Sequence, residues 1–473
     1  MRFSSTITNV LFILSALVSS ALIAQDTNVS PYSRFGIGDL DPGNFVSNFG
    51  MGGTGVGIVD PLHVNPLNPA GLSFLSQPTF EVGLKGEWGT ITSATESVDR
   101  NLARLNHFAV GFPMDKGRMG AALGLAPLST IGYTSFSNTY IPELDITQRS
   151  EYIGSGGLNR IFLNIARNFT LAADTSKYNQ NTRLALGGGL NFEFGSLSTE
   201  RNSIFPNSNG FVNTKIKDAT TFSDVNFQFS TLVRHYLDKK VSEEDSRFTI
   251  FNIGATYDLG TALNGNRSQE AYSYVENASG FESARDSINV FSDQKGKLNL
   301  PATIAIGASV DFYFRPSEAK SSHKFSVAAD YRMADWGSTT EVFDAERGFP
   351  DLGKLAMLHT GISYQPDVSL NTSRRVSSFS MATYRLGYRT GNTHLAIDNQ
   401  VLTETGMSFG LSLPVLAGGI NRTNSQLDLG VEYSSRGSTD NGLLEENFWR
   451  VMVGFSFHPY TRFDRWFQRR KYD

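Results

Sequence analysis

The chain of 473 residues contains no cysteine. A disulfide framework, a thiolate metal site and a lipid-modified N-terminal cysteine are therefore excluded. Charged residues are also scarce, at 18% of the chain, where soluble globular chains have roughly 25%. Lysine and arginine together number 41, and aspartate and glutamate number 45. The chain thus lacks the basic excess of a nucleic-acid-binding protein, and we expect no nucleic acid among its partners.

Long apolar runs of the kind that form transmembrane helices are missing as well. The two longest uncharged runs, residues 119–142 and 405–421, both contain glycine, proline and many polar side chains. A helical inner-membrane protein is therefore excluded. The one purely apolar stretch lies near the N-terminus and is followed by small residues and then Ala24-Gln25. This pattern predicts a secretory signal peptide over residues 1–24, so the mature chain is exported.

What the sequence does contain is alternation. From Leu298 to Phe314 every second residue is apolar, and the pattern recurs along the chain. Such long alternating segments are typical of tilted strands that cross a bilayer, although a large soluble β-sandwich or a β-solenoid would alternate too. About fourteen strands are predicted. They lie near residues 78–92, 105–115, 118–131, 157–171, 182–199, 219–237, 246–260, 298–315, 322–335, 355–365, 377–390, 403–417, 425–435 and 446–458.

The connections between these strands alternate between long and short. The longest is residues 261–297, and one of the shortest is the turn at residues 115–118. Bacterial outer-membrane barrels have long outer loops and short periplasmic turns. The sequence therefore predicts an all-β fold, a transmembrane antiparallel up-and-down β-barrel over residues 78–458, located in the outer membrane, with outer-membrane lipid around it.

A segment that does not alternate, residues 25–77, precedes the barrel. It is rich in glycine, and Gly50, Gly52 and Gly55 satisfy the G-x-G-x-x-G pattern. No strand–helix unit surrounds that pattern, so dinucleotide binding has little support. We expect a compact hatch inside the barrel instead, with turns at paired Asn-Pro steps. The residues assigned to this hatch and to a ligand beside it are Asn65, Pro66, Asn68, Pro69, Ala70 and Gly71.

A Gly-rich segment that closes on Asn68-Pro69-Ala70-Gly71, followed by about fourteen strands, resembles the FadL-type outer-membrane transport family. The hatch of that family carries an Asn-Pro-Ala motif. Pro127, within Gly124-Leu125-Ala126-Pro127-Leu128, also resembles the family, where a break in the third strand opens the barrel wall. The resemblance implies uptake of fatty acids or other hydrophobic small molecules, held in the lumen beside the hatch.

The last residues, 459–473, form a basic aromatic tail beyond the final predicted strand. Such a composition suits an interfacial anchor, and it also suits a docking segment for an outer-membrane or periplasmic protein partner. The residues proposed for this tail are Phe463, Arg465, Trp466, Phe467, Arg469 and Arg470.

Catalysis has little support, because the seven histidines are scattered and none has a second ligand at metal-binding spacing. We therefore expect no enzyme, no metal and no cofactor, although catalytic residues brought together from neighbouring strands stay open. Two functions compete. The first is a FadL-like channel for uptake of a hydrophobic small molecule. The alternative is a non-transporting integral barrel subunit of a larger outer-membrane secretion or protein-assembly complex.

Overall fold

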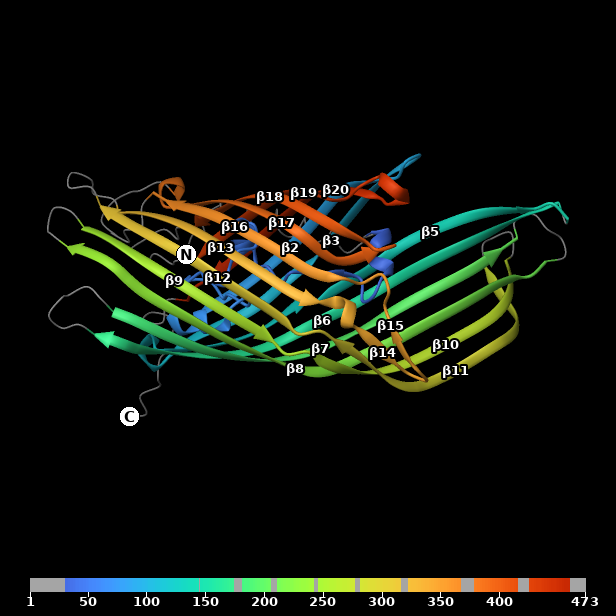
Figure 1. Ribbon diagram of the computed structural model, residues 1–473, viewed down its shortest axis with the longest axis horizontal. Helices are drawn as coiled ribbons and strands as arrows, with labels where there is room; N and C mark the ends of the chain where they lie inside the picture. The colour runs from blue at the N-terminus through green and yellow to red at the C-terminus, as the bar shows by residue number, and fades with distance from the viewer. Residues whose placement is uncertain are drawn as a thin grey trace, which may run out of the picture.

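The computed structural model of the chain describes residues 30–143, 145–173, 181–205, 211–241, 246–276, 281–315, 322–366, 378–415 and 425–459. Figure 1 shows a barrel of tilted strands, from one end of which several strands continue far beyond the rim. The predicted signal peptide and all six named residues of the predicted tail lie outside the described ranges. Among the described residues, no helix is long and apolar enough to cross a membrane.

The barrel wall is one closed antiparallel sheet. Within the described ranges, fourteen strand positions pair in sequence, and β20 pairs back onto β2, where Trp88 lies opposite Trp449. The fourteen predicted strands are therefore confirmed. The wall strands are β2 (Thr79–Thr92), β3 (Ser97–Met114), β4 (Met119–Pro127) continued by β5 (Ser129–Ile141), β6 (Ile146–Ala173), β7 (Asn181–Ile204), β8 (Asn213–Val241), β9 (Ser246–Asp258), β12 (Thr303–Arg315), β13 (His323–Asp335), β16 (Lys354–Gln365), β17 (Thr383–Ile397), β18 (Gln400–Pro414), β19 (Gln426–Gly437) and β20 (Glu445–Phe457).

Alternation along each strand separates an apolar outer face from a polar or small inner face. In β12, Ile304 and Ile306 are 42% and 50% exposed, whereas Ala305, Gly307 and Ser309 between them are buried or turned inward. Successive side chains of a strand point to opposite faces, so the exposed set must face lipid. This is the orientation that the alternating sequence predicts.

Several strands extend past the barrel end that carries the long connections. The chain segment 261–297, which was predicted to be a loop, forms most of a hairpin of β10 (Thr261–Glu276) and β11 (Glu282–Leu300). β10 pairs with the outer part of β8, so the hairpin widens the projecting sheet (Figure 1). The loop prediction was wrong because strands that lie beyond the lipid-facing wall need no continuous apolar face, and β10 is mostly polar.

The alternating run Leu298–Phe314 was also interpreted incorrectly as one strand. Leu298 and Leu300 end β11 and pair with β10, and β12 begins only at Thr303. Pro301 lies between the two strands. Because proline has no amide proton to donate to a sheet, it interrupts the pairing although the hydrophobic pattern continues.

The N-terminal segment, residues 30–77, lies in the lumen and runs from one barrel end to the other. Ser30 hydrogen bonds to Glu446, at the start of β20, while His63 reaches Asp428 near the opposite end of the wall. The short elements of the N-terminal segment are η1 (Pro31–Arg34), β1 (Asp39–Leu40), α2 (Val46–Phe49) and η2 (Pro69–Phe74). Most of its side chains are buried.

The orientation of β12 can be tested with two arginine substitutions. We expect Ile306→Arg to destabilise the barrel by about 2–4 kcal/mol, because the charge would enter the lipid near the bilayer midplane. Thr303→Arg, which places the same side chain on the lumen face near the strand end, should cost much less. Heat modifiability in detergent and urea titration in lipid measure the difference. Equal losses for both variants would contradict the orientation.

Candidate functional site: a filled lumen

The lumen is filled by close contact between backbones. In the described part of the chain, ten wall strands each turn a glycine toward the N-terminal segment, where an added Cβ atom would collide with it. A Cβ atom on Gly410, for example, would lie 2.7 Å from the Cα atom of Gly50, and one on Gly361 would lie 2.6 Å from the carbonyl oxygen of Met51. These glycines are Gly111, Gly120, Gly187, Gly254, Gly307, Gly361, Gly387, Gly410, Gly430 and Gly454.

The other four strand positions of the wall hold the N-terminal segment through polar side chains. Asp330 on β13 accepts hydrogen bonds from the backbone N–H groups of Gly55 and Val56, at 2.5 and 2.8 Å. Ser230 on β8 accepts from the N–H of Ala70. Glu81 on β2 and Asn168 on β6 hydrogen bond to the backbone of Val64 and Ser73. All fourteen strand positions of the described wall therefore contact the N-terminal segment.

The Asn-Pro residues predicted from the sequence lie inside this segment and fix its fold. Asn68 caps η2 by accepting from the N–H of Ala70, and its amide donates to Val56 and to Thr231 on β8. Asn65 accepts from Asn48 and donates to the carbonyl of Gly55. Pro69, Ala70 and Gly71 are buried in η2, and Pro66 lines a cavity. The motif therefore ties two turns of the N-terminal segment together.

Pro127 lies at a discontinuity of the wall. β4 ends at Pro127 and β5 begins at Ser129, and both pair with β6. On this side β3 pairs with β4, and no pairing of β3 with β5 occurs among the described residues. The free edge of β5 at this point is covered by the N-terminal segment, because β1 pairs with Ser129 and Thr130. Arg104 on β3 bridges the remaining gap through Asp41, at 2.7 Å.

A cavity of about 200 Å³ lies beside this discontinuity. Apolar side chains line part of it, including Leu67, Phe162 and Trp336. Charged residues line the rest, and they come from seven different segments of the chain. These are Asp41, Arg160, Asp258, Arg332, Arg389, Glu404 and Arg436. Drug-sized ligands usually occupy pockets of roughly 300–1,000 Å³, so this cavity is small for such a ligand.

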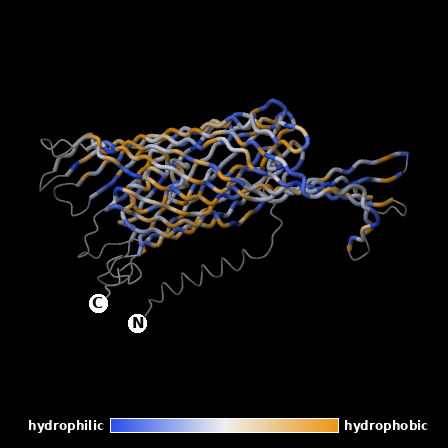
Figure 2. The backbone as a smooth tube through the Cα atoms, turned by 90° about the horizontal axis from the view of Figure 1, so that it is seen from below, coloured by the Kyte–Doolittle hydropathy of each residue, from blue (hydrophilic) through white to orange (hydrophobic). Residues whose placement is uncertain are grey.

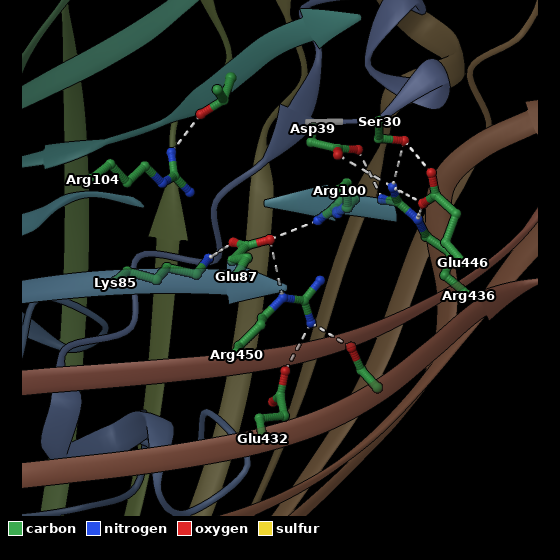
Figure 3. A network of polar contacts seen from close by, with 12 residues as sticks. Ser30, Asp39, Lys85, Glu87, Arg100, Arg104, Glu432, Arg436, Glu446 and Arg450 are labelled. Atoms are coloured by element: carbon green, nitrogen blue, oxygen red, sulfur yellow. Dashed lines mark hydrogen bonds and ion pairs between the residues drawn. The ribbon is translucent and has the colours of Figure 1, made fainter. Parts of the chain in front are cut away.

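A network of buried ion pairs fills the outer half of the lumen (Figure 3). Arg450 lies 2.8 Å from Glu432 and 3.1 Å from Glu404, and Arg389 pairs with the same two carboxylates. Glu87 pairs with Lys85, Arg100 and Arg450. Counted over the described residues, the network holds equal numbers of acids and bases. The acids are Asp39, Asp41, Glu87, Glu404, Glu432 and Glu446, and the bases are Lys85, Arg100, Arg104, Arg389, Arg436 and Arg450.

The N-terminal segment supplies two acids of this network. Arg436 pairs at once with Asp39 and with Glu446, and Ser30 bonds to both Arg436 and Glu446 (Figure 3). Burial would raise the pKa of Asp41, but Lys85 and Arg104 outweigh it, so that pKa lies below its usual range. Asp41 is therefore ionised, and it attaches the segment to β2 and β3.

The opposite end of the N-terminal segment is attached in the same way. His63 lies 3.0 Å from Asp60 and 3.3 Å from Asp428 on β19. Burial alone would lower the pKa of His63, but these two carboxylates raise it well above its usual value. His63 is therefore a cation at neutral pH. His458, just beyond β20, adds a hydrogen bond to the carbonyl of Leu62 at 2.6 Å.

The charged residues at both ends of the lumen make contacts within the chain, including contacts between the N-terminal segment and the wall. Among the described residues, no group of three or more histidine or acidic side chains is arranged to hold a metal ion. The ion-pair network and the ring of inward-facing glycines are not evident from the sequence. Apolar and polar residues alternate along each wall strand, so a single glycine or charged residue at an inward position is common and indicates nothing by itself. The signal that could have revealed them is the recurrence of such residues on almost every strand.

A closed antiparallel barrel with an apolar outer wall and a filled polar lumen is an integral protein of the outer membrane. The chain belongs to the BamG family, whose model matches residues 6–473.

Solved structures of FadL-type barrels are similar to this chain, as the sequence resemblance predicts. The toluene transporter TbuX of Ralstonia pickettii is 15% identical, with 92% of this chain and 100% of that chain covered and a TM-score of 0.48. A FadL homologue of Pseudomonas aeruginosa is 12% identical, with 87% and 98% covered and the same TM-score of 0.48. A deletion mutant of the monoaromatic hydrocarbon channel TodX is 15% identical, with 89% and 99% covered and a TM-score of 0.48. No curated protein matches the chain.

The backbone contact can be tested at two adjacent glycines of β7. A Cβ atom on Gly187 would lie 2.5 Å from the amide nitrogen of Ala70, whereas one on Gly188 would meet nothing closer than 4.0 Å. We expect Gly187→Val to displace the N-terminal segment and to produce ion conductance in planar bilayers, because water would enter the polar lumen. Gly188→Val should stay as silent as the native protein. Conductance that is unchanged in both variants would contradict the contact.

The outer ion pairs can be tested at Arg436. Arg436→Met would leave the buried carboxylates of Asp39 and Glu446 without their cation, and we expect a loss of about 3–5 kcal/mol in the free energy of unfolding. Adding Glu446→Gln should recover part of that loss. Arg149→Met, at a half-exposed pair with Glu151, is the control and should cost less than about 1 kcal/mol. Urea titration followed by tryptophan fluorescence measures all three, and equal losses at Arg436 and Arg149 would refute the prediction.

Proposed function

We propose that this protein is a non-transporting integral subunit of a larger outer-membrane secretion or protein-assembly complex. The observation that carries the proposal is the occupied lumen. The N-terminal segment contacts every strand position of the described wall, and buried ion pairs attach both of its ends. A molecule that crossed the lumen would have to separate these charges where they are buried away from water, and an unpaired buried charge is costly.

A second feature supports the proposal. The projecting sheet of β5, β6, β7, β8, β10 and β11 extends beyond the end of the barrel (Figure 1 and Figure 2). It does present a large surface outside the membrane. A barrel whose interior is closed and whose outer end is enlarged is suited to contact other proteins. Membership of the BamG family is compatible with this use.

Uptake of a hydrophobic small molecule is the second candidate. The observation that favours it is the cavity of about 200 Å³ beside Pro127. In this alternative, the molecule would reach the cavity from the side, between β3 and β5, and displacement of Asp41 and Arg104 would open the way. The seven charged side chains in the cavity lining disfavour an apolar ligand.

Gentle detergent extraction distinguishes the two candidates. We expect the native protein to leave the membrane with protein partners in fixed stoichiometry, as measured by native mass spectrometry and size-exclusion chromatography. The physical reason is that the N-terminal segment and its ion pairs occupy the path through the lumen. A lone barrel that carries a small hydrophobic molecule would contradict the proposal and would favour uptake.

We also propose that the C-terminal tail, residues 459–473, is a docking segment for one such partner. Truncation after His458 keeps the hydrogen bond of His458 to Leu62, so the barrel should fold and insert normally, because β20 ends at Phe457. We expect the truncated protein to lose at least one co-extracted partner while its heat modifiability is unchanged. Retention of all partners would assign the tail to the membrane interface instead.

A further inference from the structure

The projecting sheet has two outer edges, which belong to β5 and to β11. Only β6 pairs with residues 134–141 of β5 within the described ranges, and only β10 pairs with residues 282–296 of β11. Thr134 is seven residues beyond Pro127, where the wall strand β4 ends. The free part of the β5 edge therefore lies outside the lipid-facing wall (Figures 1 and 2).

The backbone groups of this edge point outward in a regular row. Gly132 uses both its N–H and its C=O on the side away from β6, where they meet Ser33 and Ser30 of the N-terminal segment. Bonding alternates along an antiparallel strand, so every second residue beyond Gly132 points its N–H and C=O the same way. These residues are Thr134, Phe136, Asn138 and Tyr140, and the row from 134 to 141 is about 25 Å long.

The two edges differ in their protection. The free part of β11 carries Glu282, Arg285 and Asp286 at its outer end. In contrast, β5 contains no charged residue and no proline from Ser129 to Ile141. Natural proteins place charges or proline on exposed edge strands to prevent pairing with other chains. An edge without them, in a protein that protects its other edge, is available for pairing.

The chain itself shows that this edge accepts an added strand. β1 pairs with Ser129 and Thr130 in antiparallel register, and Asp41 N–H and Ser30 N–H donate to the carbonyls of Leu128 and Gly132 at 2.9 and 3.0 Å. Among the described residues, which begin at Ser30, the added backbone reaches as far as Gly132. From Thr134 onward the same row of donors and acceptors continues with no strand on it in the described structure.

We propose that residues 134–140 of β5 bind an extended segment of a partner polypeptide outside the membrane, which adds to the sheet as a further strand. Main-chain hydrogen bonds supply the affinity in this mode, and side chains at alternate positions supply the specificity. Phe136 and Tyr140 flank the edge on one face and are 60% and 56% exposed. The guanidinium of Arg149 holds the Phe136 ring at 4.4 Å, which orders it for contact.

We assign the edge to a different polypeptide, because antiparallel pairing with β5 of a second copy in the same membrane conflicts with the symmetry of two such barrels. Two identical edge strands that pair in antiparallel fashion are related by a twofold rotation axis perpendicular to the strands. Two barrels in one membrane are related by an axis along the membrane normal. Because β5 continues a wall strand upward, these axes do not coincide. The proposal rests on the function proposed above, since it names the surface with which a complex subunit would bind its partner.

The test uses the full chain in its native complex. Asn138→Pro removes one outward N–H and leaves the β5–β6 pairing intact, because proline is tolerated on an edge. A second variant, Phe136→Lys combined with Tyr140→Lys, adds protective charges. We expect both to reduce one stoichiometric partner by at least about tenfold after gentle extraction, as loss of main-chain bonds implies. Ser283→Lys, on the β11 edge, is the control and should retain every partner.

Hydrogen exchange supplies an independent readout of the same edge. In the native complex, the amides of residues 134, 136, 138 and 140 should exchange at least about tenfold more slowly than in the isolated barrel, whereas the β11 edge should not change. If the native protein is extracted alone, the proposed function fails and this inference fails with it. If a stoichiometric partner remains bound to both β5 variants, or if the four amides exchange equally fast in both states, the proposed function stands and the edge inference is overturned.

Discussion

The structure depends on backbone-to-backbone contact between the N-terminal segment and the inner face of the barrel. A fourteen-stranded wall encloses more space than its own inward side chains fill, and a void forfeits the dispersion contacts of every atom that lines it. This protein fills the space with a segment of its own chain, and glycines on both sides allow the approach. Gly50 meets Gly410, and Gly57 meets Ala308, with no side chain between the backbones.

Such close contact leaves little room for adjustment. The ion pairs are arranged outside the region of closest backbone contact. The ion pairs of the outer lumen lie above the glycine ring, and acids and bases balance within the described residues. Phe448 is fully buried among three guanidinium groups, those of Arg100, Arg436 and Arg450, and joins the two parts of the network. A buried network of this kind is stable only when every member is present, so it specifies one position for the N-terminal segment.

Alternation predicted the wall strands well because one face of each strand must contact lipid. This requirement places an apolar residue at every second position within each strand. The strand predictions failed where the chain no longer contacts lipid. The hairpin of β10 and β11 lies beyond the lipid-facing wall and is mostly polar, and the run from Leu298 to Phe314 continues its pattern across Pro301 although the pairing changes. The lumen could not be predicted for a different reason. Ser30 and Glu446 are 416 residues apart in sequence, and nothing local in either residue indicates its partner.

The first described residues contact the hairpin formed by the last two wall strands, and this constrains the order in which the protein can fold. β19 and β20 close the wall against β2, and the same hairpin supplies Arg436, Leu444 and Glu446 to the first described residues. The N-terminal segment is therefore first in sequence but can complete its contacts only when the last two wall strands are in place. Non-local contacts of such sequence separation make folding slow. The barrel cannot seal before its last strand arrives, and at that moment closure of the seam and seating of the N-terminal segment become a single cooperative event.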